Sequence, residues 1–565
     1  MKTLIFTCIT ALMLINSIPA KASLDWNKGI LTNADGLYRH VSAIAYDPGG
    51  SIYVAGIEEF SSGNQLIVIK KYSSTGVLLF SKTNSYIIPA GTVISDGVFS
   101  ISIDASGNVY VLGTQFGTAT RKNDIVLLKY NSSLSLQWRR LIYNEAYPTA
   151  QFNEAACKML FDASGNIYVS GTWYSGATSD NTQIFVRKYT TAGTQVYNTA
   201  IAESSINIHE NASDMGIDNS LNVTVVARTI VSGVNKIVYA RVNSTGGVSW
   251  IKYCDAAVNY AFIYNPQIET TPAGTFYISS VLWRVGSPSP YYSKITISKF
   301  SSLGIRNWER FTPELSCYPN EVTLRLDASS NIYAGYDYFG TLGSGPNKYS
   351  LFKYNSAGTL LWNLVNTEAY SQYFTFETYS STALFLSYYD PATGDPKIRK
   401  IDATNGSTIW TESITVAIPA GYGSGYAAAR AIAVHQTTSE VAYCGQISGL
   451  TVAPQYATEN RWNIRKYGAT SPRLSFTEPL LTTNESEISV ITFPNPATDQ
   501  INIRYEGDEL PLCISLYDVQ GRLLKKISVT NVSAYTIPAS DFPKGIISIH
   551  SEFRSRTFVS KIILQ

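Results

Sequence analysis

The stretch DASGNIYVSG at residues 162–171 recurs along the chain, and this recurrence decides the fold. Close copies are DPGGSIYVAG (47–56), DASGNVYVLG (104–113) and DASSNIYAGY (327–336), and degenerate copies begin at Asp218, Thr271, Ser380 and Thr438. The aromatic slot of the copies is filled, in chain order, by Tyr53, Tyr110, Tyr168, Thr224, Tyr277, Tyr333, Phe385 and Ala442. A period of about 56 residues is typical of a repeat architecture.

A second motif follows the first in each unit, for example IVLLKYNSSLSLQW (125–138) and YSLFKYNSAGTLLW (349–362). It predicts a strand, a turn and a second strand that is entered near an aromatic residue. The Asp-x-x-Gly-Asn part of the first motif is also a tight turn, because Asp and Asn side chains bond nearby backbone and Gly accepts positive φ. Each unit thus predicts four antiparallel strands, called a to d, which is one blade of a β-propeller. We predict an all-β chain with an eight-bladed β-propeller over residues 23–468.

The two ends of this region predict that the ring closes. The eighth copy stops after its third strand, WNIRKYG (462–468), and no aromatic d strand follows it. The missing strand lies at the front of the chain, where LDWNKGIL (24–31) resembles LQWRRLIY (136–143). We therefore expect the amino-terminal strand to complete the last blade. A seven-bladed ring with an irregular insertion is the alternative, because the seventh and eighth copies are the weakest.

The D-x-x-G-N-x-Y-V-x-G core resembles that of secreted bacterial proteins built from β-propeller repeats. The resemblance implies fold and export, but this repeat family has no single chemistry. One segment, IDATNGSTIW (401–410), also resembles the repeat of quinone-dependent dehydrogenases. The other units carry a plain strand–turn–strand motif at that place, so we expect no cofactor.

The first 22 residues predict a secretory signal peptide, with Lys2, an apolar run over 4–15 and the cleavage site Ala20-Lys21-Ala22. A membrane anchor is the alternative, but a spanning helix needs about 20 apolar residues and this run is shorter. No transmembrane segment is expected in the mature chain. With 15% charged residues and a net charge of +2, the composition gives no basic face for nucleic acid.

Cleavage would leave five widely spaced cysteines, which are Cys157, Cys254, Cys317, Cys444 and Cys513. No C-x-x-C pair occurs, which disfavours zinc and redox motifs. We expect buried thiols, with one disulfide such as Cys254–Cys317 as the alternative.

The sequence pattern changes after residue 468. Residues 469–488 predict a linker, and residues 489–565 alternate apolar and polar residues between turns, as in a small β-sandwich. This module resembles the type A sorting domain of the type IX secretion system. The resemblance rests on Pro494-Asn495-Pro496, on Gly521 after a strand, on Gly545 in FPKGII and on Lys561 near the end, while Phe542 and Ile547 depart from the usual Leu and Tyr.

The sorting resemblance implies a partner and a destination. The partner would be the type IX secretion machinery, and the route would run through the periplasm to the outer-membrane surface or the medium of a Gram-negative bacterium. An ordinary carbohydrate-binding or immunoglobulin-like sandwich is the alternative for this module.

Catalytic and metal motifs are sparse. His40, His209, His435 and His550 never form a close pair, and no H-E-x-x-H or G-x-S-x-G occurs. The repeated Asp47, Asp104, Asp162, Asp218 and Asp327 could suggest calcium, but one carboxylate per blade cannot form a cage of about 6 to 8 oxygens. We therefore predict turn stabilisation by these Asp residues and no metal.

Aromatic residues on the b–c loops are the most informative functional feature. The b–c and d–a loops emerge on one face of a propeller, and rings there can stack on sugars or pack on a partner protein. The candidate ligand-binding residues are Phe60, Phe116, Trp173, Tyr174, Trp283, Arg284 and Tyr338. The alternative is that these rings wedge between blades. We expect a non-catalytic binding or scaffold protein for a glycan or protein. The alternatives are a carbohydrate-active hydrolase or lyase, disfavoured by a strands that look mainly apolar or small, and a structural adhesion component.

Overall fold

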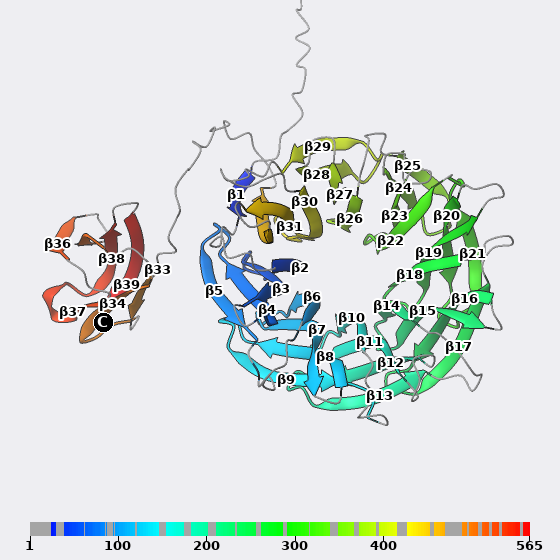
Figure 1. The fold of residues 1–565 in the computed structure, drawn as a ribbon, viewed down its shortest axis with the longest axis horizontal. Coiled ribbons are helices and arrows are strands. Elements are labelled where there is room, and N and C mark those ends of the chain that lie inside the picture. Colours follow the sequence, from blue (N-terminus) through cyan, green and yellow to red (C-terminus); the bar gives the residue numbers. More distant parts are fainter. Residues whose placement is uncertain are drawn as a thin grey trace, which may run out of the picture. The chain divides into compact units, whose positions relative to one another are not determined.

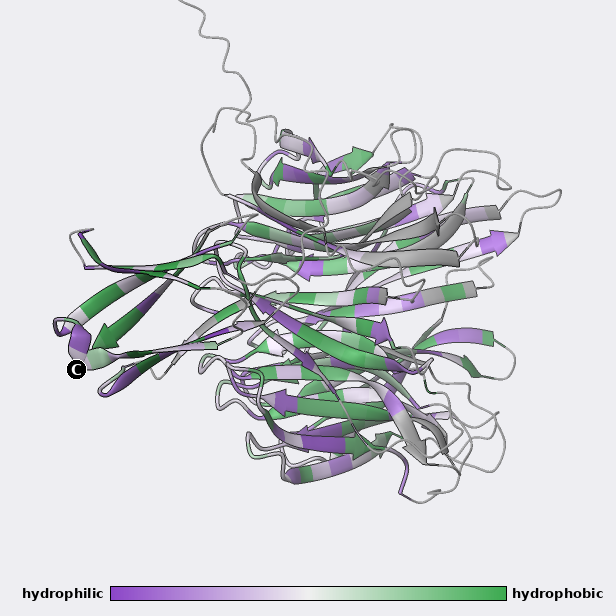
Figure 2. Ribbon diagram, turned by 60° about the vertical axis from the view of Figure 1, so that its left-hand side comes forward, coloured by the Kyte–Doolittle hydropathy of each residue, from purple (hydrophilic) through white to green (hydrophobic). Residues whose placement is uncertain are grey.

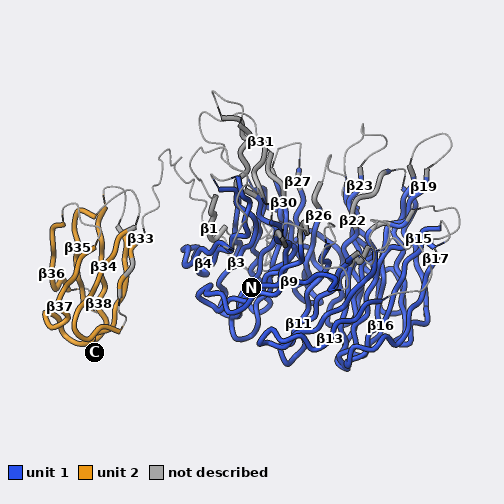
Figure 3. Tube along the Cα trace, turned by 60° about the horizontal axis from the view of Figure 1, so that its bottom comes forward, with its two compact units in different colours: residues 1–474 blue, residues 475–565 orange. Residues whose placement is uncertain are grey.

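The computed structural model divides into two compact units, residues 1–474 and 475–565 (Figure 3). The structure describes residues 24–29, 39–60, 63–84, 86, 94, 96–118, 121–145, 154–174, 182–201, 211–231, 234–255, 262–285, 291–315, 317–339, 348–365, 372–390, 395–414, 426–452, 457–468, 489–493, 496–506, 511–518, 522–529, 534–553 and 557–564. For β1 and several strand ends only the backbone is described. The predicted signal peptide and linker lie outside these residues.

The described part of the first unit consists of four-stranded antiparallel sheets that follow one another around a common centre (Figure 1). Sheets 1 to 4 contain β2 (Arg39–Tyr46), β3 (Ile52–Glu59), β4 (Gln65–Tyr72) and β5 (Leu78–Thr83); β6 (Gly97–Ile103), β7 (Val109–Thr118), β8 (Arg121–Tyr130) and β9 (Leu136–Ile142); β10 (Ala155–Phe161), β11 (Ile167–Tyr174), β12 (Thr182–Tyr189) and β13 (Gln195–Ile201); and β14 (Asn211–Ile217), β15 (Val223–Val231), β16 (Val234–Val242) and β17 (Val248–Asp255).

The remaining sheets of this unit follow the same order, except for the last. Sheets 5 to 7 contain β18 (Phe262–Thr270), β19 (Phe276–Val285), β20 (Tyr291–Phe300) and β21 (Arg306–Phe311); β22 (Tyr318–Leu326), β23 (Ile332–Phe339), β24 (Lys348–Tyr354) and β25 (Leu360–Val365); and β26 (Gln372–Thr378), β27 (Ala383–Asp390), β28 (Asp395–Asp402) and β29 (Thr408–Ser413). Sheet 8 has the order β1-β32-β31-β30, with β30 (Tyr426–Val434), β31 (Val441–Val452), β32 (Ala457–Tyr467) and β1 (Leu24–Gly29).

The repeated Asp organises the a–b turn. In sheet 3 the Ser164 and Asn166 amides donate to Asp162 Oδ1, at 3.0 and 2.9 Å. Asp162 Oδ2 accepts from Asn166 Nδ2 at 2.9 Å and from the hydroxyl of the buried Tyr168 at 3.1 Å. Asp104 and Asp327 hold the same set of partners. These carboxylates stabilise turns and anchor the aromatic slot, as the sequence predicted.

In sheets 2, 5 and 6 a lysine and a tryptophan bind the same carbonyl of the following sheet. Lys353 Nζ and Trp362 Nε1 both donate to the Ala403 carbonyl of the following sheet, at 2.6 and 3.0 Å. Lys299 and Trp308 hold Ser356 O in the same way, and Lys129 and Trp138 hold Thr191 O. These lysines also lie over the ring of their own aromatic slot. The K-Y and W positions of the second motif therefore serve inter-sheet packing, a role that was not predicted.

The Trp138 ring on the d strand of sheet 2 contacts Gly193 in the c–d turn of sheet 3, and this contact leads to a stability prediction. Gly193 has φ +78°, and a Cβ there would meet the Trp138 ring at 2.8 Å. Gly107 has nearly the same φ, +77°, but a Cβ there would meet only Ser132 Cβ at 3.5 Å. Gly193→Ala is expected to cost roughly 1–3 kcal/mol more than Gly107→Ala, because overpacking adds to backbone strain. Urea unfolding of the two variants measures the difference, and equal losses would contradict the ring contact.

The amino-terminal strand pairs with the carboxyl-terminal strand of this unit. β1 runs antiparallel to β32 with Trp26 opposite Lys466, which is the predicted pairing. Trp138 lies opposite Lys129 and Trp362 opposite Lys353 in the same register. Lys466 Nζ in turn donates to Ser74 O of sheet 1, at 3.0 Å. β1 thus occupies the place of a d strand in sheet 8.

The hydrophobic core lies between successive sheets. One cluster joins Tyr53 and Ile67 of sheet 1 to Val111 and Leu128 of sheet 2. Another joins Val54 of sheet 1 to Trp462 and Ile464 of sheet 8. Figure 2 shows hydrophobic segments within the strands of both units. No helix in the described residues is long and apolar enough to cross a membrane.

The second unit contains two sheets around a core of its own. Sheet 9 has the order β33-β34-β37 and sheet 10 the order β36-β35-β38-β39. The elements are β33 (Ser489–Phe493), β34 (Gln500–Glu506), β35 (Cys513–Tyr517), β36 (Leu523–Ser528), β37 (Ala534–Pro538), η2 (Ala539–Asp541), β38 (Gly545–Glu552) and β39 (Thr557–Leu564). Ile501, Ile503, Ile514, Leu516, Ile549 and Ile562 fill the space between the sheets.

Candidate functional site

Two of the predicted rim aromatics lie in the core. Trp173, at the end of β11, is 3% exposed, and its ring stacks on Phe185 at 4.6 Å with Arg187 above it at 5.2 Å. Tyr338 on β23 is 7% exposed, and its ring centre lies 5.2 Å from that of Tyr336. Neither ring face is available to a ligand in this conformation, because both serve packing.

The other predicted rim residues fall into three groups. The partly buried Phe60 packs against the Val54–Trp462 cluster. Phe116 and Tyr174 belong to β7 and β11, but their side chains lie outside the described residues. Trp283 and Arg284, adjacent on β19, are partly exposed. The structure therefore does not bring the seven residues into one site. Phe60, Trp283 and Arg284 are the partly exposed ones with described side chains, and of these Trp283 and Arg284 are neighbours on one strand.

Charged and aromatic groups surround this pair at the b–c end of sheet 5. Arg284 Nη2 forms an ion pair with Glu314 Oε1 at 2.9 Å, and the Arg284 guanidinium lies 4.4 Å from the centre of the Tyr292 ring. Lys294 Nζ lies 4.2 Å from the Phe311 ring centre, and burial lowers the pKa of Lys294. An indole beside a guanidinium and a carboxylate offers a stacking face and directional hydrogen bonds, which sugar and peptide ligands both use.

A charged network lines the innermost strands of sheets 3 to 7. Lys158 Nζ on β10 contacts Asp214 Oδ1 on β14 at 2.6 Å. Arg325 on β22 bridges two neighbours: Nε lies 3.0 Å from Glu377 Oε2 on β26, and Nη1 lies 3.8 Å from Glu269 Oε1 on β18. The side chains of Lys158, Glu269, Arg325 and Glu377 are 26–30% exposed, so water reaches them. Five successive innermost strands thus contribute one charge each.

These residues occupy two places in the repeat, both on the same side of the innermost strand. Lys158 and Asp214 stand four residues before the first residue of the a–b turn, and Glu269, Arg325 and Glu377 stand two before it. Sheets 8, 1 and 2 carry only small residues at both places: Ala431, Ala433, Ala43, Ala45, Ser100 and Ser102. The network was not apparent from single strands, which look mainly apolar or small. Comparing these two positions across all eight units would have indicated it.

Burial and the neighbouring opposite charges shift the pKa values of the network residues in opposite directions. Burial raises the pKa of Glu269, while Lys158 and Arg325 oppose the rise. Burial disfavours charge on Arg325, but Glu377 and Glu269 outweigh it, so the pKa of Arg325 lies above its usual value. Asp214 also accepts the Ile268 amide of the next strand, at 3.0 Å. The network therefore couples neighbouring sheets electrostatically.

A half-buried histidine on the innermost strand of sheet 1 predicts a pH dependence. Burial, and then the nearby Arg430, lower the pKa of His40 to about 4. The folded chain therefore binds this proton more weakly than the unfolded chain, so His40 should lower stability as the pH falls from about 6.5 towards 4 and have no effect above that range. The loss is at most about 3 kcal/mol, since one pKa unit is about 1.4 kcal/mol. Urea unfolding between pH 4 and 7 should show a flatter profile for His40→Gln, and identical slopes would contradict this.

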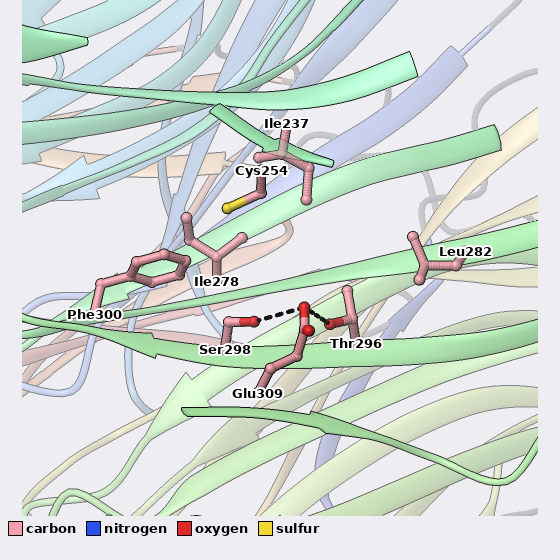
Figure 4. A pocket seen from close by; sticks show the side chains of 8 residues that line it. All are labelled: Ile237, Cys254, Ile278, Leu282, Thr296, Ser298, Phe300 and Glu309. Carbon is pink, nitrogen blue, oxygen red and sulfur yellow. Dashed lines mark hydrogen bonds between the residues drawn. The ribbon is translucent and has the colours of Figure 1, made fainter. Parts of the chain in front are cut away.

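A small cavity lies between sheets 4 and 5 (Figure 4). Its volume is about 10 Å³, roughly one water molecule. Thr296 and Ser298 donate to Glu309 Oε1 in its wall, both at 3.3 Å, and Ile278, Phe300 and Cys254 complete the lining. The cavity is too small for an organic ligand.

The five cysteines of the predicted mature chain form no disulfides. The alternative pairing of Cys254 with Cys317 is therefore wrong in this structure. Burial raises the pKa of Cys157 and Cys444 to about 12 and that of Cys317 to about 11, which keeps these thiols protonated and unreactive. Among the described residues, no three His, Cys, Asp or Glu side chains gather closely enough to hold a metal.

The predicted sorting residues lie along one module. Pro496 is exposed, and the amide of the following Ala497 donates to Ile563 O of the last strand at 2.8 Å. Gly545 begins β38 with φ +124°, a backbone conformation that favours glycine, and Lys561 is exposed on β39 opposite Ser548. Pro494, Asn495 and Gly521 lie outside the described residues. Of the two departures, Ile547 is buried in the core and Phe542 packs against it.

The family model described as "Secretion system C-terminal sorting domain" matches residues 491–565. This module is a secretion sorting domain. The sorting domain indicates that the chain is secreted or displayed at the outer-membrane surface, with the type IX secretion machinery as its partner. No curated protein matches the sequence.

Several solved structures resemble the chain remotely. A protein of unknown function from Bacteroides caccae is 14% identical, with a TM-score of 0.27, over 50% of this chain and 84% of that one. A polysaccharide lyase, the PL25 ulvan lyase, is 9% identical, with a TM-score of 0.41, over 77% and 94%. The Synechocystis apocarotenoid oxygenase is 11% identical, with a TM-score of 0.37, over 69% and 93%. These structures are too remotely similar to indicate an activity for this chain.

Proposed function

We propose that this chain is a non-catalytic binding or scaffold protein, carried by its sorting domain through the periplasm to the surface of a Gram-negative bacterium or into the medium. Its sheets are the blades of a closed eight-bladed propeller. The ligand is a glycan or a protein that meets the b–c end of blade 5.

Closure is supported by three observations on the last and first sheets. β1 takes the d-strand register on β32, Lys466 reaches the carbonyl of Ser74, and Trp462 packs with Val54 in a core shared by both sheets. β2 also lies against β30 and β31. A ring closed in this way leaves no open sheet face between its ends.

Binding is supported above all by the partly exposed Trp283 beside the Arg284–Glu314 ion pair. Trp173, at the same end of β11, is buried and serves packing, whereas Trp283 is partly exposed and has charged groups around it. Aromatic and arginine side chains carry much of the energy of recognition surfaces.

A carbohydrate-active hydrolase or lyase is the second candidate, and the inner network favours it. Asp214, Glu269 and Glu377 are carboxylates on the innermost strands β14, β18 and β26, and the pKa of Glu269 is raised, as for a general acid. Their ion pairs with Lys158 and Arg325 favour a structural role instead.

A glycan array and a surface-protein pull-down, run with the full mature chain, test the proposal. Trp283→Ala and Arg284→Ala should each weaken binding about tenfold or more, which corresponds to about 1.4 kcal/mol. Leu303→Ser is the matched control, because Leu303 is 65% exposed on the same sheet but lies in the c–d turn at the other end of the strands. Binding unchanged by the test variants would contradict the site. Turnover of a bound glycan that Glu269→Gln abolishes would favour the enzyme, and no ligand at all would favour an adhesion component.

A further inference from the structure

The cations at the b–c end of sheet 5 lie on the face of the sheet that looks toward sheet 4. Leu282 on β19 packs into the core that these two sheets share, together with Ile237 on β16. Side chains alternate along a strand, so Arg284 lies on the same face as Leu282, and Trp283 lies on the other face. Lys294 on β20 stands opposite Leu282 and therefore also looks toward sheet 4.

Sheet 4 adds a cation from the other side of this space. Arg228 on β15 stands opposite Ile237 and therefore lies on the face that looks toward sheet 5. Its Nε donates to Asn235 Oδ1 at 3.1 Å, which is a neutral partner. Two further charged residues at this end of sheet 4, Lys236 and Asp255, are opposite in sign and stand opposite each other in the register. They leave the local charge balance unchanged.

Cations outnumber carboxylates at this end of the space between sheets 4 and 5. Among the described residues there, Glu314 is the one carboxylate, and it pairs with Arg284 at 2.9 Å. The next carboxylate down the face, that of Glu309, pairs with Arg306 at 3.0 Å. The described cations at this end are Arg228, Arg284 and Lys294. No charged residue occurs in the segments that join the strands at the same end, which are 232–233, 256–261 and 286–290.

The two cations of sheet 5 each lie over an aromatic ring. The Arg284 guanidinium lies 4.4 Å from the centre of the Tyr292 ring, and Lys294 Nζ lies 4.2 Å from that of the Phe311 ring. The Phe311 side chain is 41% exposed. An acidic sugar can place its C–H groups against such rings while its carboxylate or sulfate binds the cations beside them.

The backbone at this end offers little to an extended peptide. β19 and β20 pair as far as Val285 and Tyr291. On the other edge of β20, Ser293 exchanges both backbone hydrogen bonds with Leu315, at 2.8 Å each. Strand addition needs an edge with unpaired backbone groups. These strands therefore suit recognition of an acidic sugar by side chains better than pairing with an acidic peptide.

We propose that the b–c end of the space between sheets 4 and 5 binds the anionic groups of an acidic polysaccharide, through Arg284, Lys294 and Arg228. The inference rests on the proposed binding function and specifies its ligand. Charge complementarity supports it, because an anionic ligand balances the positive charge that one carboxylate leaves. Glu314 competes with the ligand for Arg284, so the loss of its charge should strengthen binding.

The first test compares charged and neutral polysaccharides that share a backbone, with the full mature chain as the binder. Polygalacturonate should bind at least about tenfold more tightly than its fully methyl-esterified form, and dextran sulfate against dextran makes the same comparison for sulfate. A preference for either acidic polymer supports the proposal and shows which anionic group is bound. Binding should weaken as the salt concentration rises, because salt screens exposed charges. Equal binding of charged and neutral polymers would overturn the acidic ligand.

The second test changes single charges. Arg284→Gln/Lys294→Gln should weaken binding of the acidic polymer about tenfold or more. Glu314→Gln should instead strengthen it about twofold or more, whereas a weakening would show that the ion pair only supports the site and would contradict the proposal. Lys82→Gln is the matched control, because Lys82 is exposed on β5 of sheet 1 and its loss changes the net charge equally. Its affinity should stay within about twofold of the unmodified chain.

These outcomes separate the ligand class from the binding function itself. A neutral glycan whose binding Trp283→Ala weakens would keep the function and overturn the acidic ligand. Binding of an acidic protein without any acidic polysaccharide would overturn the ligand class in the same way, and the absence of any ligand would overturn both. An unchanged thermal midpoint shows that a variant is folded, and an unfolded double variant is replaced by Lys294→Gln alone.

Discussion

Deleting residues 24–29 is expected to cost at least about 4 kcal/mol of stability and to make the chain aggregate, although the segment lies at the very start of the predicted mature protein. Without β1, β32 becomes an unpaired edge strand, and edge strands recruit other chains. The buried Asn463 and Ile464 on β32, which pair with Gly29 and Lys28, would lose the strand beside them. Urea unfolding and size-exclusion chromatography measure both effects.

A permuted chain is the control for this deletion. Re-attaching the sequence of residues 24–29 after Tyr467, through a copy of the turn at 355–359, places it as a normal d strand. The register permits this, because Leu24 pairs with Tyr467 and Trp26 with Lys466, just as Leu360 pairs with Tyr354 and Trp362 with Lys353. The permuted chain should regain most of the lost stability. A deletion as stable as the full chain would show that β1 does not close the ring.

The repeat explains why the strands could be predicted from sequence. An Asp-x-x-Gly turn and a strand rich in β-branched residues are local features of the sequence. Because the motif occurs eight times, its close copies allow the degenerate copies to be recognised. The pairing of β1 with β32 was predictable for the same reason, since Trp26 and Trp138 occupy one slot of one pattern.

The site was harder to predict, because it depends on which way single side chains turn. Trp173 and Trp283 both end a b strand, yet the first stacks on Phe185 of its own sheet and the second is partly exposed. The inner network depends on contacts between strands more than 50 residues apart, such as Arg325 with Glu377. Only the packing of successive sheets brings these charges together, so no local motif marks them.

Trp173→Ala is expected to destabilise the propeller unit by roughly 3–5 kcal/mol, the usual cost of removing a buried Trp side chain. The ring is 3% exposed, lies parallel to Phe185 within 16° and supports Arg187, so its loss leaves a cavity and an arginine without its aromatic partner. It belongs to the cluster that joins sheets 2 and 3, together with Leu112 and Ile125. Urea unfolding followed by tryptophan fluorescence measures the change.

Trp283→Ala is the matched control, since it removes the same side chain from the same end of another b strand. It should cost less than about 2 kcal/mol, because a partly exposed indole leaves no closed cavity. Trp173→Phe should recover more than half of the loss, because a smaller ring can still stack on Phe185. Ligand binding should respond in the opposite order, with Trp283→Ala weakening it and Trp173→Phe leaving it intact. A stable Trp173→Ala variant that loses binding would restore Trp173 to the ligand site and contradict the packing role that its burial indicates.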